Sequence, residues 1–443
     1  MSSVYIIRDR QEENIAINQT EETWLKEREL ELEWFCGFSE AESMFYISTT
    51  GALSFKIKLH WDDRQTLEYI KNLLSELVNR EVGVIVDSKN LHESYYIIAK
   101  FQDILEVLIP IFSKYYLTTS KYLDFQDFKA AAEIRKRSSP LPPGGEGMIR
   151  QPKAAARSYM EKRKLSKEEL NEILNKKSGM NSQRLVFNIK DLPKRSLSIS
   201  RILGFVEGDG SFYISNMVPT FSIKQHSKNV HFFYQIAEFL NKLPYCPEIG
   251  PEIDKLNTRP TPGIYQDSPN TCNLSVANIL QNYNYILPFF KSLKFISRKG
   301  VDFELWGLAV KLKTLGYTTK PEGKKCFIEI TKYINKRYTT DAQVAEAPCL
   351  YKINEILNQP PVFDLSSGLS YKALSDLVKV SKKGNSGFGV NVYDNGRLLE
   401  GSPFSSYTQA ALALGNVNVS SVISKKIDTD KLYKGRYIFE SSV

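Results

Sequence analysis

The sequence contains no run of about 18 apolar residues, which excludes a membrane-spanning helix. Its five cysteines show no C-x-x-C spacing, so neither a disulfide framework nor a zinc site is indicated, and we expect the reduced cysteines of an intracellular protein. Only four histidines occur, and none pairs with another at the spacing of metal ligands. The N-terminal segment carries several glutamates and no apolar core, so we expect neither a secretory signal nor an organelle import peptide.

At 443 residues the chain is longer than one ordinary domain and is expected to form two or three. Apolar and charged residues make up 42% and 25% of the sequence, as in globular proteins with a sizeable core. The net charge is +9 and the isoelectric point is about 9.0. This balance indicates a polyanionic partner, nucleic acid before a membrane surface, although a basic protein without a specific partner is the alternative.

One short pattern occurs twice in the chain. The first copy is GFSEAESMFYI at residues 37–47, and the second is GFVEGDGSFYI at residues 204–214, which lies 167 positions later. A second pair of matching segments follows, SFKIKLH at residues 54–60 and TFSIKQH at residues 220–226. Both alternate apolar and polar residues with period two, which predicts a strand with one apolar face and one polar, basic face.

The similarity continues further along both copies. Each predicted strand precedes a helical pattern, TLEYIKNLL in one copy and FFYQIAEFL in the other. Residues 108–125 then match residues 286–303. The aligned pairs are Pro110 and Pro288, Lys121 and Lys299, and Asp124 and Asp302. Because order and spacing persist over about a hundred residues, we interpret the chain as two copies of one α+β domain.

The repeated pattern carries chemistry if it forms the end of a helix. Small residues recur on one helix face at a spacing of four, and they are Gly37, Ala41, Gly204 and Gly208. Small residues at this spacing allow two helices to approach until their backbones touch. Glu42 and Asp209 would then lie side by side, where their charges repel unless divalent cations sit between them. Oxygen ligands without histidine suit Mg²⁺, whereas two acidic helix ends without a ligand are the structural alternative.

Residues 35–43 and 202–210 resemble the motif L-A-G-L-I-D-A-D-G. The chain is therefore similar to the two-repeat, monomeric LAGLIDADG homing endonucleases encoded in fungal mitochondrial introns. The first copy departs from the motif at two positions, with Glu42 in place of Asp and Ser43 in place of Gly. The resemblance implies two pseudo-symmetric αββαββα domains whose sheets form a DNA-binding saddle.

The resemblance also implies which residues bind metal. The eighth letter of the motif is the metal-binding acid, which gives Glu42 in the first copy and Asp209 in the second. The neighbouring residues Ala41 and Gly208 are further candidate metal ligands, and Mg²⁺ is the implied cofactor.

A basic residue beside the active site is a further feature of the family, and it would steady developing charge or polarise the solvent. Lys121 and Lys299 match it, with Arg298 as the alternative in the second copy. Polar residues on the strands are expected to contact bases and phosphates along the major groove, with a solvated sheet face as the alternative. These candidates are Tyr46, Lys56, Lys58, His60, Tyr213, Ser222, Lys224 and His226.

We expect six segments in the chain. They are an N-terminal extension at 1–29, LAGLIDADG domains at 30–135 and 196–340, a basic Pro/Gly-containing linker at 136–195, a second linker at 341–370 and a C-terminal module at 371–443. The first linker is either a solvated connection or a basic strap that touches phosphates. Within it, Ser166 and Glu169 predict a capping box and a short helix.

The C-terminal module has a different pattern. Asp394, Asn395 and Gly396 predict a hairpin, and two short helices joined at Gly415 follow it in a helix-turn-helix cadence. The segment is similar to the small NUMOD1-type DNA-binding modules appended to intron-encoded nucleases, and a structural cap without a DNA role is the alternative. The candidate groove or phosphate contacts are Ser420, Ser421, Lys425 and Lys426.

Together these features predict an Mg²⁺-dependent, site-specific double-strand DNA endonuclease with a role in intron homing. By resemblance we expect a monomer encoded in the mitochondrion, with double-stranded DNA as its partner and no membrane contact. An RNA maturase that binds its host intron on the same fold, with or without cleavage, is the alternative. A transcriptional regulator is disfavoured, because such a protein would not need two acids at the helix ends.

Overall fold

The computed structural model describes residues 21–137, 165–184, 187–244, 259–335, 347–365, 389–404, 407–415, 419–429 and 431–442. It divides into two compact units, residues 1–360 and 361–443, which are described separately. Within the described ranges no helix combines the length and apolar character needed to cross a membrane. Residues 138–164 of the predicted basic linker lie outside these ranges.

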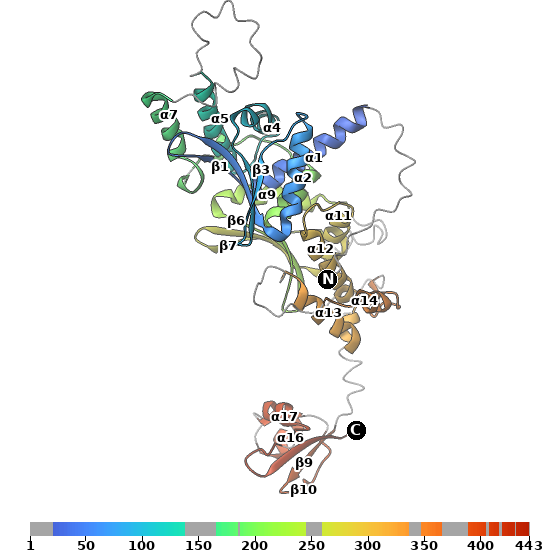
Figure 1. Cartoon of the computed structure of the whole chain (residues 1–443). Coiled ribbons are helices and arrows are strands. Elements are labelled where there is room, and N and C mark those ends of the chain that lie inside the picture. Colours follow the sequence, from blue (N-terminus) through green and yellow to red (C-terminus); the bar gives the residue numbers. More distant parts are fainter. Residues whose placement is uncertain are drawn as a thin grey trace, which may run out of the picture. The chain divides into compact units, whose positions relative to one another are not determined.

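The first unit contains two repeats of one arrangement of helices and strands (Figure 1). The first repeat consists of α1 (Glu21–Glu42), β1 (Ser43–Ile47), β2 (Leu53–His60), α2 (Arg64–Glu76), β3 (Val84–Ser88), β4 (Glu93–Ile98), α3 (Phe101–Asp103), α4 (Ile109–Lys114), α5 (Lys121–Arg137) and α7 (Lys167–Ser178). The second consists of α8 (Ile199–Asp209), β5 (Gly210–Ser215), β6 (Val218–His226), α9 (Val230–Asn241), β7 (Gly263–Ser268), β8 (Thr271–Val276), α10 (Ile279–Gln281), α11 (Leu287–Lys291), α12 (Lys299–Thr314) and α13 (Pro321–Tyr333), and α14 (Leu350–Leu357) follows it.

Each repeat builds one antiparallel sheet of four strands. The strand orders are β1-β2-β4-β3 and β5-β6-β8-β7, so the two sheets have the same topology. Their registers also correspond, because Phe45 pairs with Phe55 in the first sheet and Phe212 with Phe221 in the second. These four rings are fully buried in one core that extends through both repeats. The predicted pair of α+β domains is confirmed, and the alternation of the strands is explained by one buried face.

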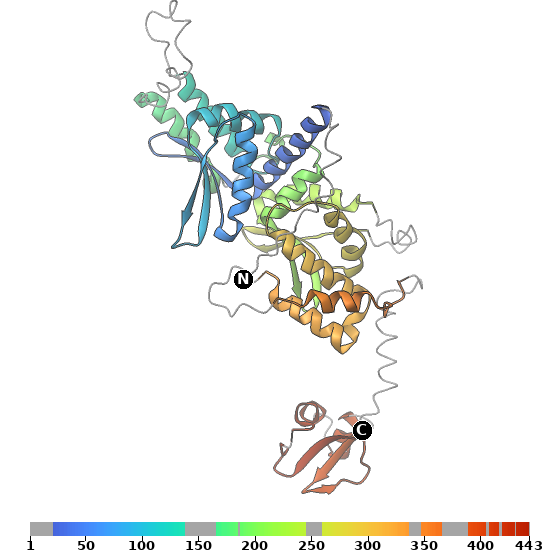
Figure 2. The same cartoon turned by 45° about the vertical axis from the view of Figure 1, so that its right-hand side comes forward.

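Helices cover one face of each sheet. In the second repeat α12 packs on β5 and β6, and Figure 2 shows α12 and α13 lying across that side of the sheet. Pro110 and Pro288 lie at the second residue of α4 and α11, directly after turns of π-helix at Ile104–Leu108 and Asn282–Ile286. A proline inside a helix removes a hydrogen bond and crowds the preceding turn, so the wider π turn accommodates it in both repeats.

Helix α7 lies inside the segment predicted as the first linker. Ser166 caps it by accepting from the backbone N–H of Glu169, whose side chain accepts in turn from the N–H of Ser166. The predicted capping box and helix are therefore confirmed. The helix packs against α5 of the first repeat, so this part of the segment adds to the repeat's core.

One asparagine makes the same pair of hydrogen bonds near the end of each repeat. In each, an asparagine with positive φ donates its backbone N–H to an aspartate and its side-chain amide to a carbonyl of the first strand. The residues are Asn181, Asp124 and Phe45 in the first repeat and Asn335, Asp302 and Phe212 in the second. The aspartates aligned by sequence thus hold these asparagines from α5 and α12, and the asparagine side chains bond the first strand of each sheet.

Helices α1 and α8 cross at their glycines. A Cβ atom at Gly37 would lie 2.0 Å from the carbonyl oxygen of Arg201, and one at Gly204 would lie 2.1 Å from that of Trp34. A Cβ atom at Gly208 would lie 2.3 Å from the Cβ of Ala41. Real Cβ atoms do not approach other atoms this closely, so the two backbones touch at these positions.

The second unit contains a three-stranded sheet and two helices. The strands are β9 (Gly389–Asp394), β10 (Arg397–Leu398) and β11 (Tyr437–Ser442) in the order β10-β9-β11, and the helices are α16 (Tyr407–Ala413) and α17 (Ser420–Lys426). Asn395 and Gly396 both have positive φ, as a tight hairpin turn requires. Val392, Ile423 and Phe439 are fully buried between sheet and helices. The hairpin and the helix pair match the prediction, whereas the start of the predicted module, residues 371–388, lies outside the described ranges.

The close helix crossing predicts that adding one methyl group at Gly204 destabilises the fold. Replacing Gly204 with alanine should lower the free energy of unfolding by about 1–3 kcal/mol or more, because the new Cβ forces the backbones apart. Thermal or urea unfolding of the purified variant measures the loss. Gly263→Ala is the matched control, since its Cβ would meet the carbonyl oxygen of Ser275 at an ordinary 3.8 Å. Wild-type stability in Gly204→Ala would contradict the proposed contact.

Candidate active site

Glu42 and Asp209 are the last residues of the two crossing helices. Burial raises the pKa of Glu42 to about 7, and the negative charge of Asp209 contributes to that rise while Lys299 and Lys121 oppose it. Burial also raises the pKa of Asp209, against a hydrogen bond from Gln225. The two acids therefore share one electrostatic environment in which a positive charge is favoured.

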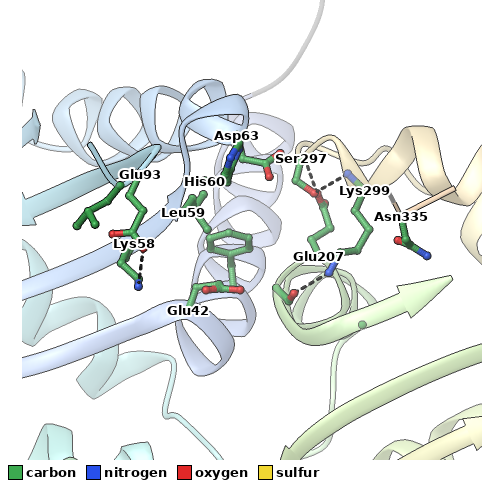
Figure 3. Close-up of a pocket in the computed structure, with 14 residues that line it drawn as sticks. Glu42, Lys58, Leu59, His60, Asp63, Glu93, Glu207, Ser297, Lys299 and Asn335 are labelled. Atoms are coloured by element: carbon green, nitrogen blue, oxygen red, sulfur yellow. Dashed lines mark hydrogen bonds and ion pairs between the residues drawn. The ribbon is translucent and has the colours of Figure 1, made fainter. Parts of the chain in front are cut away.

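Glu42 lines a pocket of about 420 Å³ that also contains Lys58, His60, Asp63 and Lys299 (Figure 3). Both repeats contribute to its walls. An acid that lies in a pocket with a raised pKa is a candidate functional group.

Lys121 and Lys299 reach the ends of the acid-bearing helices. The Nζ of Lys121 donates to the carbonyl oxygens of Ser39 at 2.9 Å and Ser43 at 2.6 Å, with that of Ala41 at 3.4 Å. The last carbonyls of a helix have no partner within it, so these bonds hold the end of α1 in place. Burial lowers the pKa of Lys121, and the nearby carboxylates, Asp209 first, act in the opposite direction.

Lys299 makes the equivalent bonds in the second repeat. Its Nζ donates to the carbonyl oxygens of Gly208 at 2.6 Å and Val206 at 3.2 Å. Arg298, the alternative considered from the sequence, instead forms an ion pair with Asp62 at 2.9 Å. The geometry therefore pairs Lys299, not Arg298, with Lys121.

Each motif contains a second acid that the sequence interpretation left without a role. Glu40 and Glu207 are buried and accept backbone N–H groups from the loops that lead into α5 and α12. Their donors include Thr118 and Thr119 for Glu40 and Ile296 and Ser297 for Glu207. Residues two apart on a helix point about 200° away from each other, so the second acid of each motif bonds these loops, whereas Glu42 lines the pocket and Asp209 bonds Gln225. Glu207 also lies at the pocket wall. The sequence could have indicated these two acids, because both occupy the sixth position of the repeated motif.

Two side chains cross from one helix to the buried acid of the other. Trp34 on α1 donates its Nε1–H to Glu207 at 2.9 Å, and Arg201 on α8 donates to Glu40 at 3.5 Å. Arg201 also bonds Glu33 at 2.8 Å and is fully buried. Trp34 and Arg201 occupy equivalent positions in the two copies, 167 residues apart, so the two braces are reciprocal. Sequence reasoning missed them because the two residues differ in type.

Asp209 has a partner that Glu42 lacks. Gln225 on β6 donates from its Nε2 to the carboxylate of Asp209. The Oε1 of Gln225 accepts from the side-chain amide of Asn229 at 3.2 Å, and the Oδ1 of Asn229 accepts from the N–H of Ser120 at 3.0 Å. Neither amide was singled out in the sequence, because the equivalent positions of the first copy hold other residues.

The predicted DNA-contacting residues lie on the strands β1, β2, β5 and β6. The exposed ones are Tyr46, Lys58, Lys224 and His226, the half-buried ones are Lys56, His60 and Tyr213, and the buried one is Ser222. Ser222 is only 6% exposed, because it lies between Ser211 and Ser275 of the neighbouring strands. It therefore offers little surface to a ligand.

Several of these side chains already have partners. Lys58 pairs with Glu93 at 3.0 Å and Lys224 with Asp267 at 2.9 Å, so each sheet carries one lysine–acid pair on its exposed face. The ammonium of Lys56 lies 4.6 Å from the centre of the Tyr46 ring.

The two predicted histidines cap the short helical turns that follow β2 and β6. His60 and His226 each accept a backbone N–H through Nδ1, from Asp62 and Lys228 respectively. Because both histidines have this role, the end of β2 corresponds to the end of β6.

The candidates of the second unit lie on α17. Ser421 and Lys425 are exposed and Ser420 is half-buried. Lys426 donates to the carbonyl oxygen of Leu432 at 2.6 Å. The side chains that face solvent are thus Ser421 and Lys425.

Comparisons with known proteins identify relatives of both repeats. Residues 35–132 and 202–310 match the LAGLIDADG endonuclease family. The mitochondrial protein RF1 of Saccharomyces cerevisiae, described as uncharacterized, is 24% identical over 438 residues, which cover 92% of this chain and 81% of that protein. A probable intron-encoded endonuclease 2 of Neurospora crassa is 33% identical over 116 residues, 26% of this chain and 25% of that one.

The fold also resembles a solved structure. The meganuclease I-SmaMI, bound to uncleaveable DNA, superposes with a TM-score of 0.52 at 21% identity, over 69% of this chain and 97% of that one. Each repeat of this chain thus matches the LAGLIDADG endonuclease family, and the structural likeness shows a shared fold.

Proposed function

We propose that this protein is a site-specific, metal-dependent endonuclease that cuts both strands of a DNA duplex. The observation that carries the proposal is the meeting of Glu42 and Asp209 at the ends of two helices whose backbones touch. Two half-buried acids at this position are costly for the fold, and a cation-dependent reaction gives them a use. Relatives named as intron-encoded endonucleases and a DNA-bound structural neighbour support this choice.

The residues at the helix ends fit a hard divalent cation. Among the residues that the structure describes, no group of three or more His, Cys, Asp and Glu side chains is arranged to hold a metal by itself. The proposed site has two carboxylates, so a bound cation would need further oxygen ligands. Glu42 and Asp209, with the carbonyls of Ala41 and Gly208, would hold Mg²⁺, which takes most remaining ligands from phosphate and water. Such an ion activates water and stabilises the leaving oxygen of a phosphodiester.

The polar faces of the two sheets supply the surface for DNA. Lys58 and Lys224 would exchange their carboxylate partners for phosphates, and Tyr46 with Lys56 would contact the duplex beside them. Because one chain contains both repeats, a monomer covers both halves of the target. By resemblance the cleavage serves homing of an intron in the mitochondrion, and the second unit adds flanking contacts of the NUMOD1 type through Lys425 and its neighbours.

Replacing either acid tests the proposal directly. Glu42→Gln and Asp209→Asn should each abolish double-strand cleavage of the intron-less allele in Mg²⁺, with at least a hundredfold loss of rate. DNA binding should remain, because the substitutions keep size and remove only a metal-binding charge. Glu238→Gln is the matched control, since Glu238 is an exposed acid on α9 that pairs with Lys242. Full cleavage by both active-site variants would refute the assignment.

The raised pKa of Glu42 predicts the pH dependence of cleavage. With a pKa of about 7, Glu42 is protonated below neutral pH, and its proton competes with the cation. At low Mg²⁺ the cleavage rate should therefore fall up to tenfold per pH unit below about pH 7. Saturating Mg²⁺ should move this fall to lower pH. A pH profile that does not change with Mg²⁺ concentration would contradict this account.

Removing the second unit should leave the chemistry intact. A chain that ends at Pro360 keeps both acids, both sheets and both lysines, so the cut position should not change. Each lost phosphate contact should reduce the slope of log affinity against log salt by about 0.9. Lys425→Ala in the full chain tests one such contact. An altered cut position would mean that the second unit sets the register on DNA, and an unchanged slope would mean that it does not touch this DNA.

A further inference from the structure

The two halves of the active site are supported differently. Gln225 is the residue before His226 at the end of β6, and Leu59 is the residue before His60 at the end of β2. Both histidines cap the following turn through Nδ1, so Gln225 and Leu59 are structurally equivalent. One is a polar amide that bonds Asp209, whereas the other is apolar and lines the pocket of Glu42 (Figure 3).

The next pair of equivalent residues differs in the same way. Asn229 and Asp63 are the N-cap residues of α9 and α2, with φ of −96° and −98° and ψ of 13° and 14°. Asn229 accepts from the backbone of Ser120 and donates to Gln225. The side chain of Asp63 has no N–H to donate.

This chain of hydrogen bonds fixes the orientation of both amides in the second repeat. The Oδ1 of Asn229 is held by Ser120, so its Nδ2 faces the Oε1 of Gln225, and the Nε2 of Gln225 must then face Asp209. The N–H of His226 also donates to that Oε1, at 3.2 Å. Asp209 is thus held by a donor whose own direction is determined by the backbone of the other repeat.

The equivalent side chains, Leu59 and Asp63, cannot form this chain to Glu42. Leu59 has no hydrogen-bonding group, and Asp63 places a further carboxylate near Glu42 that opposes its charged form. Glutamate also has one more rotatable bond than aspartate, so more conformational freedom is lost when it is held.

On the basis of the endonuclease activity proposed above, we infer that the two strands are cut in a fixed order. The strand whose cleavage depends on Asp209 is cut first, and Gln225 with Asn229 are the positioning residues that make it faster. Preorganised ligands need no rearrangement when the cation and the phosphodiester arrive, and misplacement by about 1 Å costs up to about a hundredfold in rate. We expect a rate difference between the strands of about ten- to a hundredfold.

Strand-specific kinetics test the order. A duplex that contains the target is labelled differently on its two strands and cut under single-turnover conditions with Mg²⁺, while a supercoiled plasmid reports any nicked intermediate. Glu42→Gln and Asp209→Asn identify the strand that depends on each acid. The nicked form should accumulate, with the Asp209-dependent strand broken. Equal rates, or earlier cleavage of the Glu42-dependent strand, would overturn the inference.

Substituting the residues beside the two acids distinguishes a positioning role of Gln225 from a purely structural one. Gln225→Met keeps the length of the side chain and should slow only the Asp209-dependent strand, by about tenfold. Leu59→Gln combined with Asp63→Asn should speed the other strand. If Gln225→Met slows both strands equally, or changes only the melting temperature, Gln225 is structural and the inference fails.

Cation binding without DNA gives a readout that does not need cleavage. Calorimetric titration with Mn²⁺ should show tighter binding to Glu42→Gln, which keeps the supported Asp209, than to Asp209→Asn. Equal affinities would overturn the inference even if the protein proves not to cut DNA. Absence of all cleavage by the wild type, with unequal affinities, would instead refute the proposed endonuclease.

Discussion

The contact between α1 and α8 leaves no space for a side chain at either crossing point, and the rest of the molecule depends on it. Gly37 and Gly204 each face a backbone carbonyl of the opposite helix. This approach places the last residues of both helices together. The braces from Trp34 and Arg201 cross the same contact and join each helix to the buried acid of the other.

The helix ends also concentrate negative charge where a protein would ordinarily avoid it. A helix C-terminus carries partial negative charge, so an acid there is unfavourable, and a second acid nearby adds to the cost. Lys121 and Lys299 relieve part of this cost by bonding the terminal carbonyls, yet the pKa of Glu42 still rises to about 7. A divalent cation would remove the remaining repulsion, which links the electrostatics of the fold to its chemistry.

Comparison of the two copies in sequence could predict what they share. It pointed to the glycines, the two acids at the helix ends, the lysines beside them and the buried strand faces, because each recurs at a fixed spacing. It could not predict features that differ between copies, such as the braces and the amide chain at Gln225, since no repeat marks them. The burial of Ser222 depends on strand register, and the packing of α7 on α5 depends on tertiary contacts that no local pattern reveals.

The central claim is that Glu42 and Asp209 together hold cations at a scissile DNA site. Anomalous diffraction from Mn²⁺ in crystals of the protein with a duplex recovered by binding selection tests it most directly. The account predicts anomalous peaks within about 2.3 Å of carboxylate oxygens of both residues, and against phosphate oxygens of the DNA. Peaks elsewhere, or none at the helix ends in a well-ordered complex, would contradict it.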